Sequence, residues 1–385
     1  MSHRPTVHQP SRTYPRRILL CATGMSPQIV TETLYALAVK PMSGQEPWIP
    51  SEIHLVTTTR GAEHARLNLL AGDAWFLALC NDYCLPPIAF DATHIHVIAG
   101  ADNRPLPDIR TPQDNEAAAD QIADLVRRFA GDVETQLHVS LAGGRKTMSY
   151  YLGYALSLYG RPQDRLSHVL VSEPFESHPA FYYPTPDEWV IHTRDAHPVA
   201  MDCATAKVQL AEIPFVRLRD GLPQRLLHGR AHFTATVDAA NRAQGRPQLA
   251  LLPQALSVCV NGLEVKLGSA EFALLLWLAK RAQSDDPEVD WQDAVAVSGE
   301  FLPLLPSIFG PLGSEVERIE AALHPTLAQR DAKGLANYFQ VQMSRLNKTL
   351  RDELGEPLAR RCMIERVGAR GQSRYRLPAD VDLML

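Results

Sequence analysis

Residues 140–147 read Ser-Leu-Ala-Gly-Gly-Arg-Lys-Thr and combine features that suit the binding of an anion. Gly143 and Gly144 leave backbone N–H groups accessible, and a helix is predicted to begin directly after them. Arg145 and Lys146 in its first turn oppose the helix dipole, which is unfavourable unless an anion lies nearby. The segment is not a P-loop, because an arginine stands where that motif has a glycine before its lysine. We therefore favour an anion-binding loop over a solvated surface loop, and expect no ATP hydrolysis.

A second loop, residues 22–28, follows a short apolar segment and reads Ala-Thr-Gly-Met-Ser-Pro-Gln. Gly24 would let the backbone approach a ligand closely. Thr23, Ser26 and Gln28 supply hydrogen-bonding side chains. A capped helix start would by itself also explain the serine. The loop lacks the G-x-G-x-x-G pattern, so a dinucleotide pocket of the usual kind is not expected.

Two further segments fall at the same edge of the predicted fold. Residues 108–111 (Asp-Ile-Arg-Thr) form either a polar loop or a rim that contacts a ligand, and the sequence favours neither. Residues 57–60 (Thr-Thr-Thr-Arg) end a predicted strand. The predicted ligand-binding residues are therefore Thr23, Gly24, Met25, Gln28, Thr58, Arg60, Asp108, Arg110, Thr111, Gly143, Gly144, Arg145 and Thr147.

Strand-like and helix-like segments that would position these loops alternate from residue 17 to about residue 171. Predicted strands cover 17–23, 52–58, 94–99, 136–141 and 166–172, and predicted helices cover 27–39, 62–81, 114–130 (with Asp114 as N-cap) and 147–159. This alternation predicts right-handed βαβ units and a Rossmann-like parallel sheet. Ligands of such sheets bind at the carboxyl ends of the strands. Residues 181–183 and 188–192 flank a Pro-rich turn and are predicted to form a terminal hairpin.

The C-terminal part follows a different pattern. A hairpin is predicted around Asn261-Gly262, helices over 269–282, 315–323 and 334–354, and a strand–turn–strand over 363–377. Together these elements describe an α+β winged helix. We divide the chain into a flexible tail (1–16), a Rossmann-like α/β domain (17–200), a connector (201–255, with a strand-like piece at 213–218) and a winged-helix domain (256–385).

Positive charge is concentrated near the C-terminus. Residues 333–376 hold ten Lys and Arg against four Asp and Glu, a formal charge of +6 in a chain whose net charge is -5. Such a face could bind the DNA backbone, or it could be the solvated face of a dimerisation domain, and the two remain equally supported. The candidate DNA contacts are Arg345, Lys348, Arg351, Arg370 and Arg374.

The overall composition is that of an ordinary globular protein. The 385 residues are 45% hydrophobic and 21% charged, which excludes disorder and suggests two or three domains. No apolar stretch approaches the roughly 20 residues that span a bilayer. The arginine-rich first 17 residues precede an apolar run that is too short for a signal peptide. We expect a cytoplasmic protein without membrane contact.

The six cysteines are scattered and are interpreted as buried thiols. A zinc site could be drawn from Cys80, Cys84, His94 and His96. We disfavour it, because no second cysteine pair completes the four ligands. No acidic metal-binding cluster is apparent in the sequence, so neither a metal nor another cofactor is expected.

Three motifs, in this order, resemble a CRISPR-associated family. They are ATGMSP (22–27), DIRTPQDNEAAAD (108–120) and SLAGGRKTMSYYLGYAL (140–156). The family is that of ring nucleases carrying a CARF (CRISPR-associated Rossmann fold) domain. The resemblance covers about residues 17–200, and PFVRLRDGL (214–222) and the C-terminal segment are also similar to family members. The C-terminal segment further resembles the winged helix of response regulators.

The resemblance implies a two-fold dimer that binds cyclic oligoadenylate, the second messenger of type III CRISPR systems, across its interface. It implies metal-independent cleavage, with cyclic tetra-adenylate a better expectation than hexa-adenylate. Ser26 matches the position that orients the ribose, and Lys146 matches the position that stabilises the scissile phosphate. Gly143 and Gly144 match the glycines that cradle that phosphate.

The residues themselves are compatible with this chemistry. A 2′-hydroxyl can attack its adjacent phosphate if the site enforces in-line geometry and neutralises the growing charge. The Arg-x-x-x-x-His mark of a ribonuclease module is absent, because none of the 14 histidines has Arg or Lys five residues before it. The alternative function is a winged-helix regulator whose DNA affinity responds to cyclic oligoadenylate, with little or no cleavage.

Overall fold

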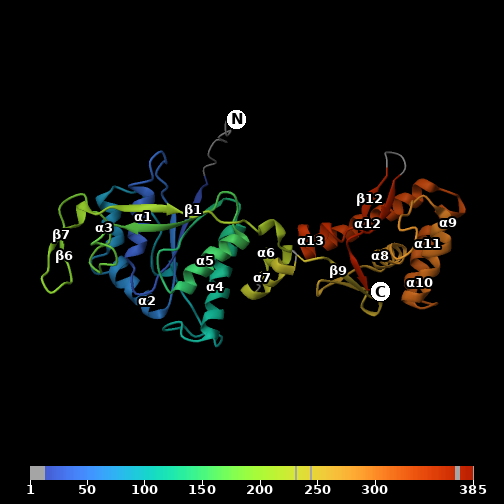
Figure 1. The fold of residues 1–385 in the computed structure, drawn as a ribbon, viewed down its shortest axis with the longest axis horizontal. Helices are drawn as coiled ribbons and strands as arrows, with labels where there is room; N and C mark the ends of the chain where they lie inside the picture. The colour runs from blue at the N-terminus through green and yellow to red at the C-terminus, as the bar shows by residue number, and fades with distance from the viewer. Residues whose placement is uncertain (1–13, 230–231, 243–244, 369–372, 385) are drawn as a thin grey trace. The chain divides into compact units, whose positions relative to one another are not determined.

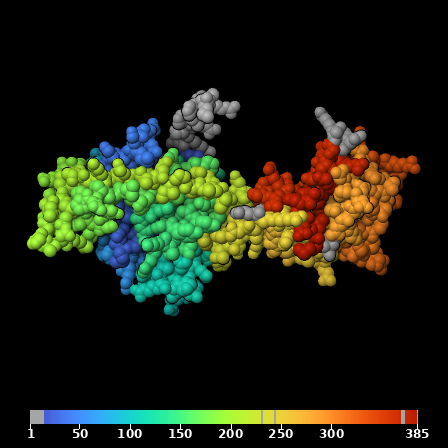
Figure 2. Space-filling model, in the orientation of Figure 1, coloured from blue at the N-terminus to red at the C-terminus, as the bar shows by residue number. Residues whose placement is uncertain are grey.

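The computed structural model describes residues 14–229, 232–242, 245–368 and 373–384. The chain divides into two compact units (Figure 1). The first unit comprises Met1–Arg219 and Arg230–Phe233, and the second comprises Asp220–Gly229 and Thr234–Leu385. Figure 2 draws the same units with all atoms, the first mainly in blue and green and the second mainly in yellow to red.

The first unit is built on a six-stranded sheet in the order β3-β2-β1-β4-β5-β8. Its strands are β1 (Arg16–Ala22), β2 (Glu52–Thr57), β3 (Ile95–Val97), β4 (Thr135–Ser140), β5 (Arg165–Val171) and β8 (Val208–Glu212). The first five are parallel, and β8 joins β5 in antiparallel orientation. The mainly parallel α/β sheet predicted from the strand–helix alternation is therefore confirmed.

Helices cover both faces of this sheet. They are α1 (Gln28–Ala38), α2 (Thr59–Ala65), α3 (Trp75–Asp82), α4 (Pro112–Gly131) and α5 (Lys146–Tyr159). Helix α1 packs beside α3 and against β5 and β8, while α4 and α5 pack together against β4 (Figure 1). The central strand β1 is buried from Ile18 to Ala22, which is why its sequence is a continuous apolar run.

Strand register brings three loops to one edge. Cys21 of β1 lies opposite Leu55 of β2 and Ser140 of β4, so these strands end at nearly the same level. The loops that follow them, 23–27, 58 and 141–145, therefore emerge side by side at the carboxyl edge of the sheet.

Several predictions for the first unit are corrected. The helix predicted over 62–81 is interrupted, because α2 runs into a π-helical turn at Arg66–Leu70 and the backbone then turns at Gly72 (φ 57°) before α3. The N-cap of α4 is Thr111 rather than Asp114. The side chain of Asp114 instead accepts from the backbone N–H of Thr111, completing a capping box.

The predicted terminal hairpin is also different. Strand β6 (Val190–His192) pairs with β7 (Ala200–Asp202), and not with residues 181–183. Those three aromatic residues are buried instead, and Tyr182 stacks on Trp75 with ring centroids 4.9 Å apart. Burial of large rings thus outweighs strand pairing here.

The segment 201–255, predicted to be a connector, contributes to both units. It contributes β8 (Val208–Glu212) to the six-stranded sheet of the first unit, and the strand predicted over 213–218 does not form. Val208 and Leu210 face the core while Gln209 is exposed, the alternation expected of an edge strand. Pro214 lacks an N–H group and cannot continue the ladder.

The second unit combines a small sheet, a hairpin and a helical layer. Its elements are α6 (Gln224–His228), α7 (Phe233–Arg242), β9 (Gln248–Leu252), β10 (Ser257–Val260), β11 (Leu263–Lys266), α8 (Ser269–Ala282), α9 (Ala294–Ala296), α10 (Leu302–Phe309), α11 (Ser314–Ala328), α12 (Ala332–Leu354), α13 (Glu356–Arg360), β12 (Glu365–Val367), β13 (Arg374–Arg376) and β14 (Asp382–Met384). The sheet order is β11-β10-β9-β14, and β12 and β13 form a separate two-stranded sheet. Trp277, Trp291, Phe301 and Phe339 form the centre of the core.

Predictions for the second unit are confirmed in their main elements. The Asn261-Gly262 turn joins β10 to β11, and α8, α11 and α12 occupy the predicted segments. The terminal hairpin forms between β12 and β13. The sequence did not predict α10, α13, β9 or β14, and β14 adds to the sheet by pairing with β9, more than 130 residues earlier.

No helix within the described part of the chain is long and apolar enough to cross a bilayer.

The six cysteines are all free thiols. Cys21, Cys203 and Cys362 are buried as predicted, and Cys80 and Cys259 are only partly buried. Cys84 is exposed and lies just after α3 in a left-handed conformation.

Candidate functional site at the carboxyl edge of the sheet

A hollow of about 580 Å³ opens where the loops after β1, β2 and β4 meet. Nine of the residues predicted from the sequence line it, together with Pro107 and Met148. These nine are Gly24, Met25, Thr58, Arg60, Asp108, Gly144, Arg145, Lys146 and Thr147. Segments far apart in the sequence thus converge on one cavity, as the βαβ pattern predicted.

The charge of Arg145 is balanced within the chain. Its Nε donates to Asp108 Oδ1 at 3.0 Å, and its Nη2 donates to the other carboxylate oxygen. The guanidinium lowers the pKa of Asp108 below its ordinary value. The expectation that Arg145 needs an external anion is therefore corrected, because the Asp108 carboxylate already balances the charge of its guanidinium.

Lys146 differs from its neighbour. It is the first residue of α5 and is exposed, and no carboxylate of the described residues lies within ion-pair distance of it. Arg60, across the hollow, is exposed and likewise has no such ion pair within the described ranges. The hollow therefore carries three cations against one carboxylate, Asp108, next to the N-terminus of a 14-residue helix.

Two glycines make this hollow sterically feasible. Gly144 has φ 78°, a conformation that side chains disfavour. A Cβ atom on Gly143 would lie 2.8 Å from the carbonyl oxygen of Ala22 and 3.1 Å from Ile29 Cγ1. The loop after β4 can therefore lie against the loop after β1 only if this position has no side chain.

A second, smaller hollow of about 250 Å³ adjoins the first and shares Gly24, Met25 and Gly144 with it. Ser26 and Gln28 line this second hollow, and Gly143 forms part of its wall. The two residues assigned catalytic roles by resemblance, Ser26 and Lys146, thus line neighbouring hollows rather than a single one.

The second hollow contains functional groups that sequence reasoning missed. Glu32 on α1 is 7% exposed, and burial, aided by the charge of Glu176, raises its pKa to about 8. His168 and His178 also line this hollow. The sequence did hold a signal for Glu32, which lies one helical turn after Gln28 in a mostly apolar helix. Because glutamate is rarely buried, a glutamate in such a helix is a candidate functional residue.

Gln28 presents an unsatisfied acceptor in the same place. Its Nε2 donates to the carbonyl of Pro179 at 2.9 Å, which fixes the orientation of the amide. Its Oε1 is buried and has no hydrogen-bond partner among the residues that the structure describes. A buried acceptor without a donor is costly, so this oxygen is poised to accept from a ligand.

Three predicted ligand residues instead hold the loops. Thr23 is fully buried, and its hydroxyl donates to the carbonyl of Gly24. Thr111 caps α4, and the backbone N–H of Arg110 donates to Asp114 at 3.0 Å. Neither Arg110 nor Thr111 lines either hollow.

The predicted DNA contacts lie in the second unit. Arg345 and Lys348 are exposed on α12, and Arg374 is exposed on β13. None of these three pairs with a carboxylate of the described residues, whereas Arg351 lies 3.5 Å from Glu356. Arg370 falls outside the described residues.

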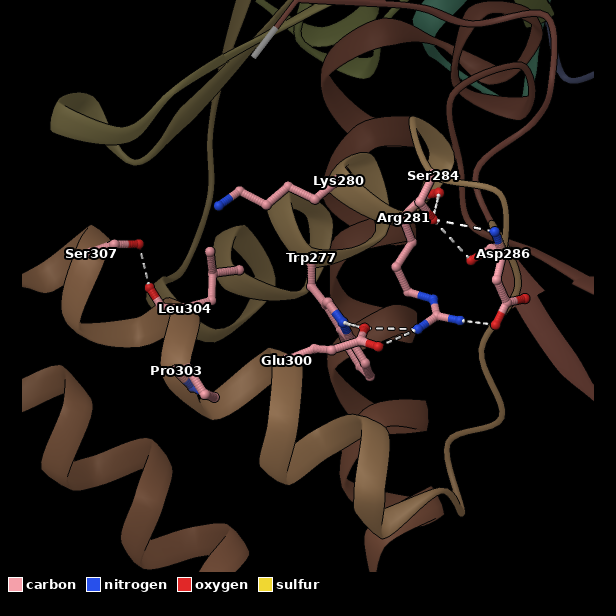
Figure 3. A pocket seen from close by; sticks show the side chains of 9 residues that line it. All are labelled: Trp277, Lys280, Arg281, Ser284, Asp286, Glu300, Pro303, Leu304 and Ser307. Atoms are coloured by element: carbon pink, nitrogen blue, oxygen red, sulfur yellow. Dashed lines mark hydrogen bonds and ion pairs between the residues drawn. The ribbon is translucent and has the colours of Figure 1, made fainter.

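The second unit also has a hollow of about 550 Å³ beside α8 and α10 (Figure 3). Arg281 donates to Glu300 at 2.8 and 2.7 Å and to Asp286 at 2.6 Å, and Trp277 donates to Glu300 at 2.9 Å. Figure 3 shows Lys280 pointing away from this network. Arg281 is paired with both Asp286 and Glu300, so we interpret the network as a structural contact that holds α8 against the 286–300 segment.

Similarity to individual known proteins is low. A search of curated proteins found no match. A solved structure, Enterococcus italicus Csm6 bound to cyclic hexa-2′-fluoro-hexa-dAMP, is 11% identical in sequence with a TM-score of 0.24. The alignment covers 88% of this chain and 59% of the Csm6 chain.

The family match lies mainly in the first unit. Residues 26–246 match the family described as CRISPR-associated protein NE0113. This range begins after β1, includes the other five strands of the sheet and the loop after β4, and exceeds half of the chain. The chain therefore belongs to the CRISPR-associated protein NE0113 family.

Proposed function

We propose that this protein binds cyclic oligoadenylate at the carboxyl edge of its parallel sheet and cleaves it without a metal ion. Membership of a CRISPR-associated family and the motif resemblance to CARF ring nucleases support this proposal. The observation that carries it is the exposed Lys146, which has no carboxylate partner in the described residues and begins α5 in a glycine-walled, cationic hollow. Such a site suits a phosphodiester.

The proposed reaction is an internal transesterification. The 2′-hydroxyl of one ribose attacks the adjacent phosphorus, a bond from O2′ to phosphorus forms, and the bond from phosphorus to O5′ breaks. The proton lost from the 2′-hydroxyl is balanced by the proton taken up at O5′. The products are a linear oligonucleotide with a 2′,3′-cyclic phosphate and a 5′-hydroxyl.

The side chains have distinct proposed roles. Lys146 and the backbone N–H groups at the start of α5 stabilise charge that grows on the phosphoryl oxygens. Ser26 orients the attacking ribose from the adjoining hollow. Gly143 and Gly144 let the phosphate approach the backbone closely.

A symmetric ring suits a symmetric dimer. In a two-fold homodimer, each subunit can present the same loop to opposite phosphates of the ring. Cyclic tetra-adenylate is proposed as the substrate in preference to hexa-adenylate.

The test is incubation of the protein with cyclic tetra-adenylate and cyclic hexa-adenylate in EDTA, with separation of the products. Cleavage is expected to persist in chelator.

Lys146→Ala should still bind the ring but cleave it at least about 100-fold more slowly in single-turnover assays, the usual effect of removing one transition-state donor. Ser26→Ala should also slow cleavage. Lys207→Ala, which removes an exposed lysine outside both hollows, is the matched control.

Two results would overturn the proposal. If EDTA abolishes cleavage and a divalent ion restores it, the metal-independent mechanism is wrong. If Lys146→Ala cleaves as fast as Lys207→Ala, the lysine has no role in stabilising the transition state.

A second candidate function is supported by the exposed cations of the second unit. We propose as the alternative that α12 and the β12–β13 hairpin bind DNA, with affinity that responds to cyclic oligoadenylate. Arg345, Lys348 and Arg374 are exposed and have no carboxylate partner within the described residues. Binding through such side chains would be electrostatic and salt-dependent.

The alternative is tested by replacing Arg345, Lys348 and Arg374 together with glutamine. If they bind DNA phosphates, the slope of log K against log salt should flatten by roughly 0.9 for each phosphate that is no longer neutralised. The double variant Lys266→Gln with Lys280→Gln is the control, since both lysines are exposed in the same unit outside 333–376. Equal DNA affinity for the triple variant and the control would leave the ring nuclease as the remaining proposal.

A further inference from the structure

We propose that Glu52, His54 and His94 form a binding site for one zinc-type divalent metal ion at the amino edge of the first unit's sheet. Glu52 is the first residue of β2, whereas Thr58 of the anion hollow follows the last residue of that strand. The proposed metal site therefore lies at the opposite edge of the sheet and does not rest on the proposed function.

The three side chains already converge. One ligand atom from each, a carboxylate oxygen or an imidazole nitrogen, lies within 4.8 Å of the other two. His54 Nε2 is 2.9 Å from Glu52 Oε2, and the rings of His54 and His94 have centroids 4.9 Å apart. Bonds of about 2.0–2.2 Å to one ion place tetrahedral ligand atoms about 3.4 Å apart, so the His54–Glu52 pair would open slightly to admit the ion.

Burial suits a bound ion that remains accessible from one side. The side chains of His54, His94 and Glu52 are 10%, 17% and 21% exposed. Phe129 of α4 packs on the ring of His54 at a centroid distance of 4.6 Å. Two imidazoles and one carboxylate with a fourth position open to water make up a known type of zinc site.

Each proposed ligand is held by a further contact, as ligands of protein metal sites usually are. His94 Nδ1 lies 2.9 Å from Asp91 Oδ1, which leaves Nε2 for the metal. His54 Nδ1 lies 2.9 Å from His96 Nε2, which leaves its own Nε2 for the metal.

Arg16 holds the third ligand. Its Nε donates to Glu52 Oε1 at 2.6 Å and its Nη2 to Oε2 at 3.0 Å, so the carboxylate orientation is fixed. The guanidinium also lies 3.6 Å from Asp132, which shares its charge and reduces its repulsion of a cation. Each carboxylate oxygen retains acceptor capacity for a metal bond.

A bound ion would stabilise one edge of the sheet. β3 is a three-residue edge strand, and His94 ends the turn that precedes it. A metal shared by His94 and the first residues of β2 would tie that turn to the neighbouring strand. Cys80, which the sequence grouped with His94 as a zinc ligand, is not in this cluster.

The test uses tag-free protein stripped with chelator and then titrated with Zn²⁺ alone, with affinity measured by competition against a chromogenic chelator. The wild type should bind one Zn²⁺ per chain, and its melting temperature should rise on binding. His94→Ala should bind at least about 100-fold more weakly. Asp91→Asn should bind about 10–100-fold more weakly, because it removes only the group that orients His94. His197→Ala, an exposed histidine elsewhere in the unit, should bind as the wild type does.

Co²⁺ provides an independent readout, because its visible absorption reports four-coordinate binding. The wild type should show this absorption and His94→Ala should lose it. The proposal is overturned if the wild type binds no more zinc than His94→Ala, or if Asp91→Asn binds as tightly as the wild type. Ring cleavage should be equal in His94→Ala and wild type, so this test and that of the proposed function fail independently.

Discussion

Asp108 and Arg145 determine how much positive charge the anion hollow presents. The two hydrogen bonds to Asp108 neutralise the charge of Arg145. Lys146 and Arg60 have no ion pair within the described residues, so they supply the net positive charge of the hollow. An exposed ion pair of this kind contributes little to the free energy of unfolding. Its main effect is therefore on the electrostatic potential that a ligand meets in the hollow.

Asp108→Asn should therefore free the guanidinium for a ligand phosphate. The slope of log K against log salt for ring binding is expected to steepen by roughly 0.7, the value for one additional phosphate neutralised on a single strand. Fluorescence titration at several salt concentrations would measure it. Asp102→Asn, whose carboxylate pairs with Arg104 at 3.7 Å on an exposed loop, should leave the slope unchanged. An unchanged slope in Asp108→Asn would mean that Arg145 does not contact the ligand.

Glu32 should make the stability of the first unit depend on pH. Its pKa is about 8 in the folded chain and near 4.5 when it is exposed, so the folded state binds the proton more tightly. The contribution is fully present below about pH 4.5 and is lost as pH rises through 8. The loss is on the order of a few kcal/mol at most. Glu32→Gln should abolish this fall.

The measurement for Glu32 is the free energy of unfolding in urea between pH 5 and pH 9. Glu63→Gln, which replaces an exposed glutamate of α2, should retain the wild-type profile. If Glu32→Gln and wild type lose stability equally over this range, the carboxyl group of Glu32 is not buried as described.

At the scale of elements, the site depends on how closely the loops after β1 and β4 approach. Gly143→Ala would place a Cβ atom 2.8 Å from a backbone oxygen that has no freedom to rotate away. We expect a loss of about 1–3 kcal/mol in unfolding free energy, as for other overpacked sites, and slower ring cleavage. Gly131→Ala, where a Cβ atom meets nothing within 4 Å, should change stability by less than about 0.5 kcal/mol. Equal melting temperatures for the two variants would contradict the close approach.

At the scale of the whole molecule, the proposed dimer makes a stoichiometric prediction. If one ring spans two identical hollows, calorimetric titration of Lys146→Ala with cyclic tetra-adenylate should saturate at one ring per two chains. Light scattering should give twice the mass of one chain. A stoichiometry of one ring per chain, on a monomer, would exclude a shared ring.

The periodicity of the sequence determined the architecture of the first unit. Apolar runs alternating with amphipathic segments predict parallel strands and helices, because backbone hydrogen bonding and burial impose these periods locally. The same pattern brought the loops at 22–28, 57–60, 108–111 and 140–147 to one edge, since all parallel strands end on the same side. Most of the residues predicted for the anion hollow follow from this geometry alone.

Only the tertiary structure decided which side chains are paired and which are available. Arg145 and Lys146 are adjacent and chemically alike, yet Arg145 reaches Asp108, 37 residues earlier, and Lys146 does not. The burial of Glu32 and the gathering of Glu52, His54 and His94 likewise depend on elements distant in the sequence. Charge pairing and burial are properties of three-dimensional neighbours, which the spacing of residues along the chain does not specify.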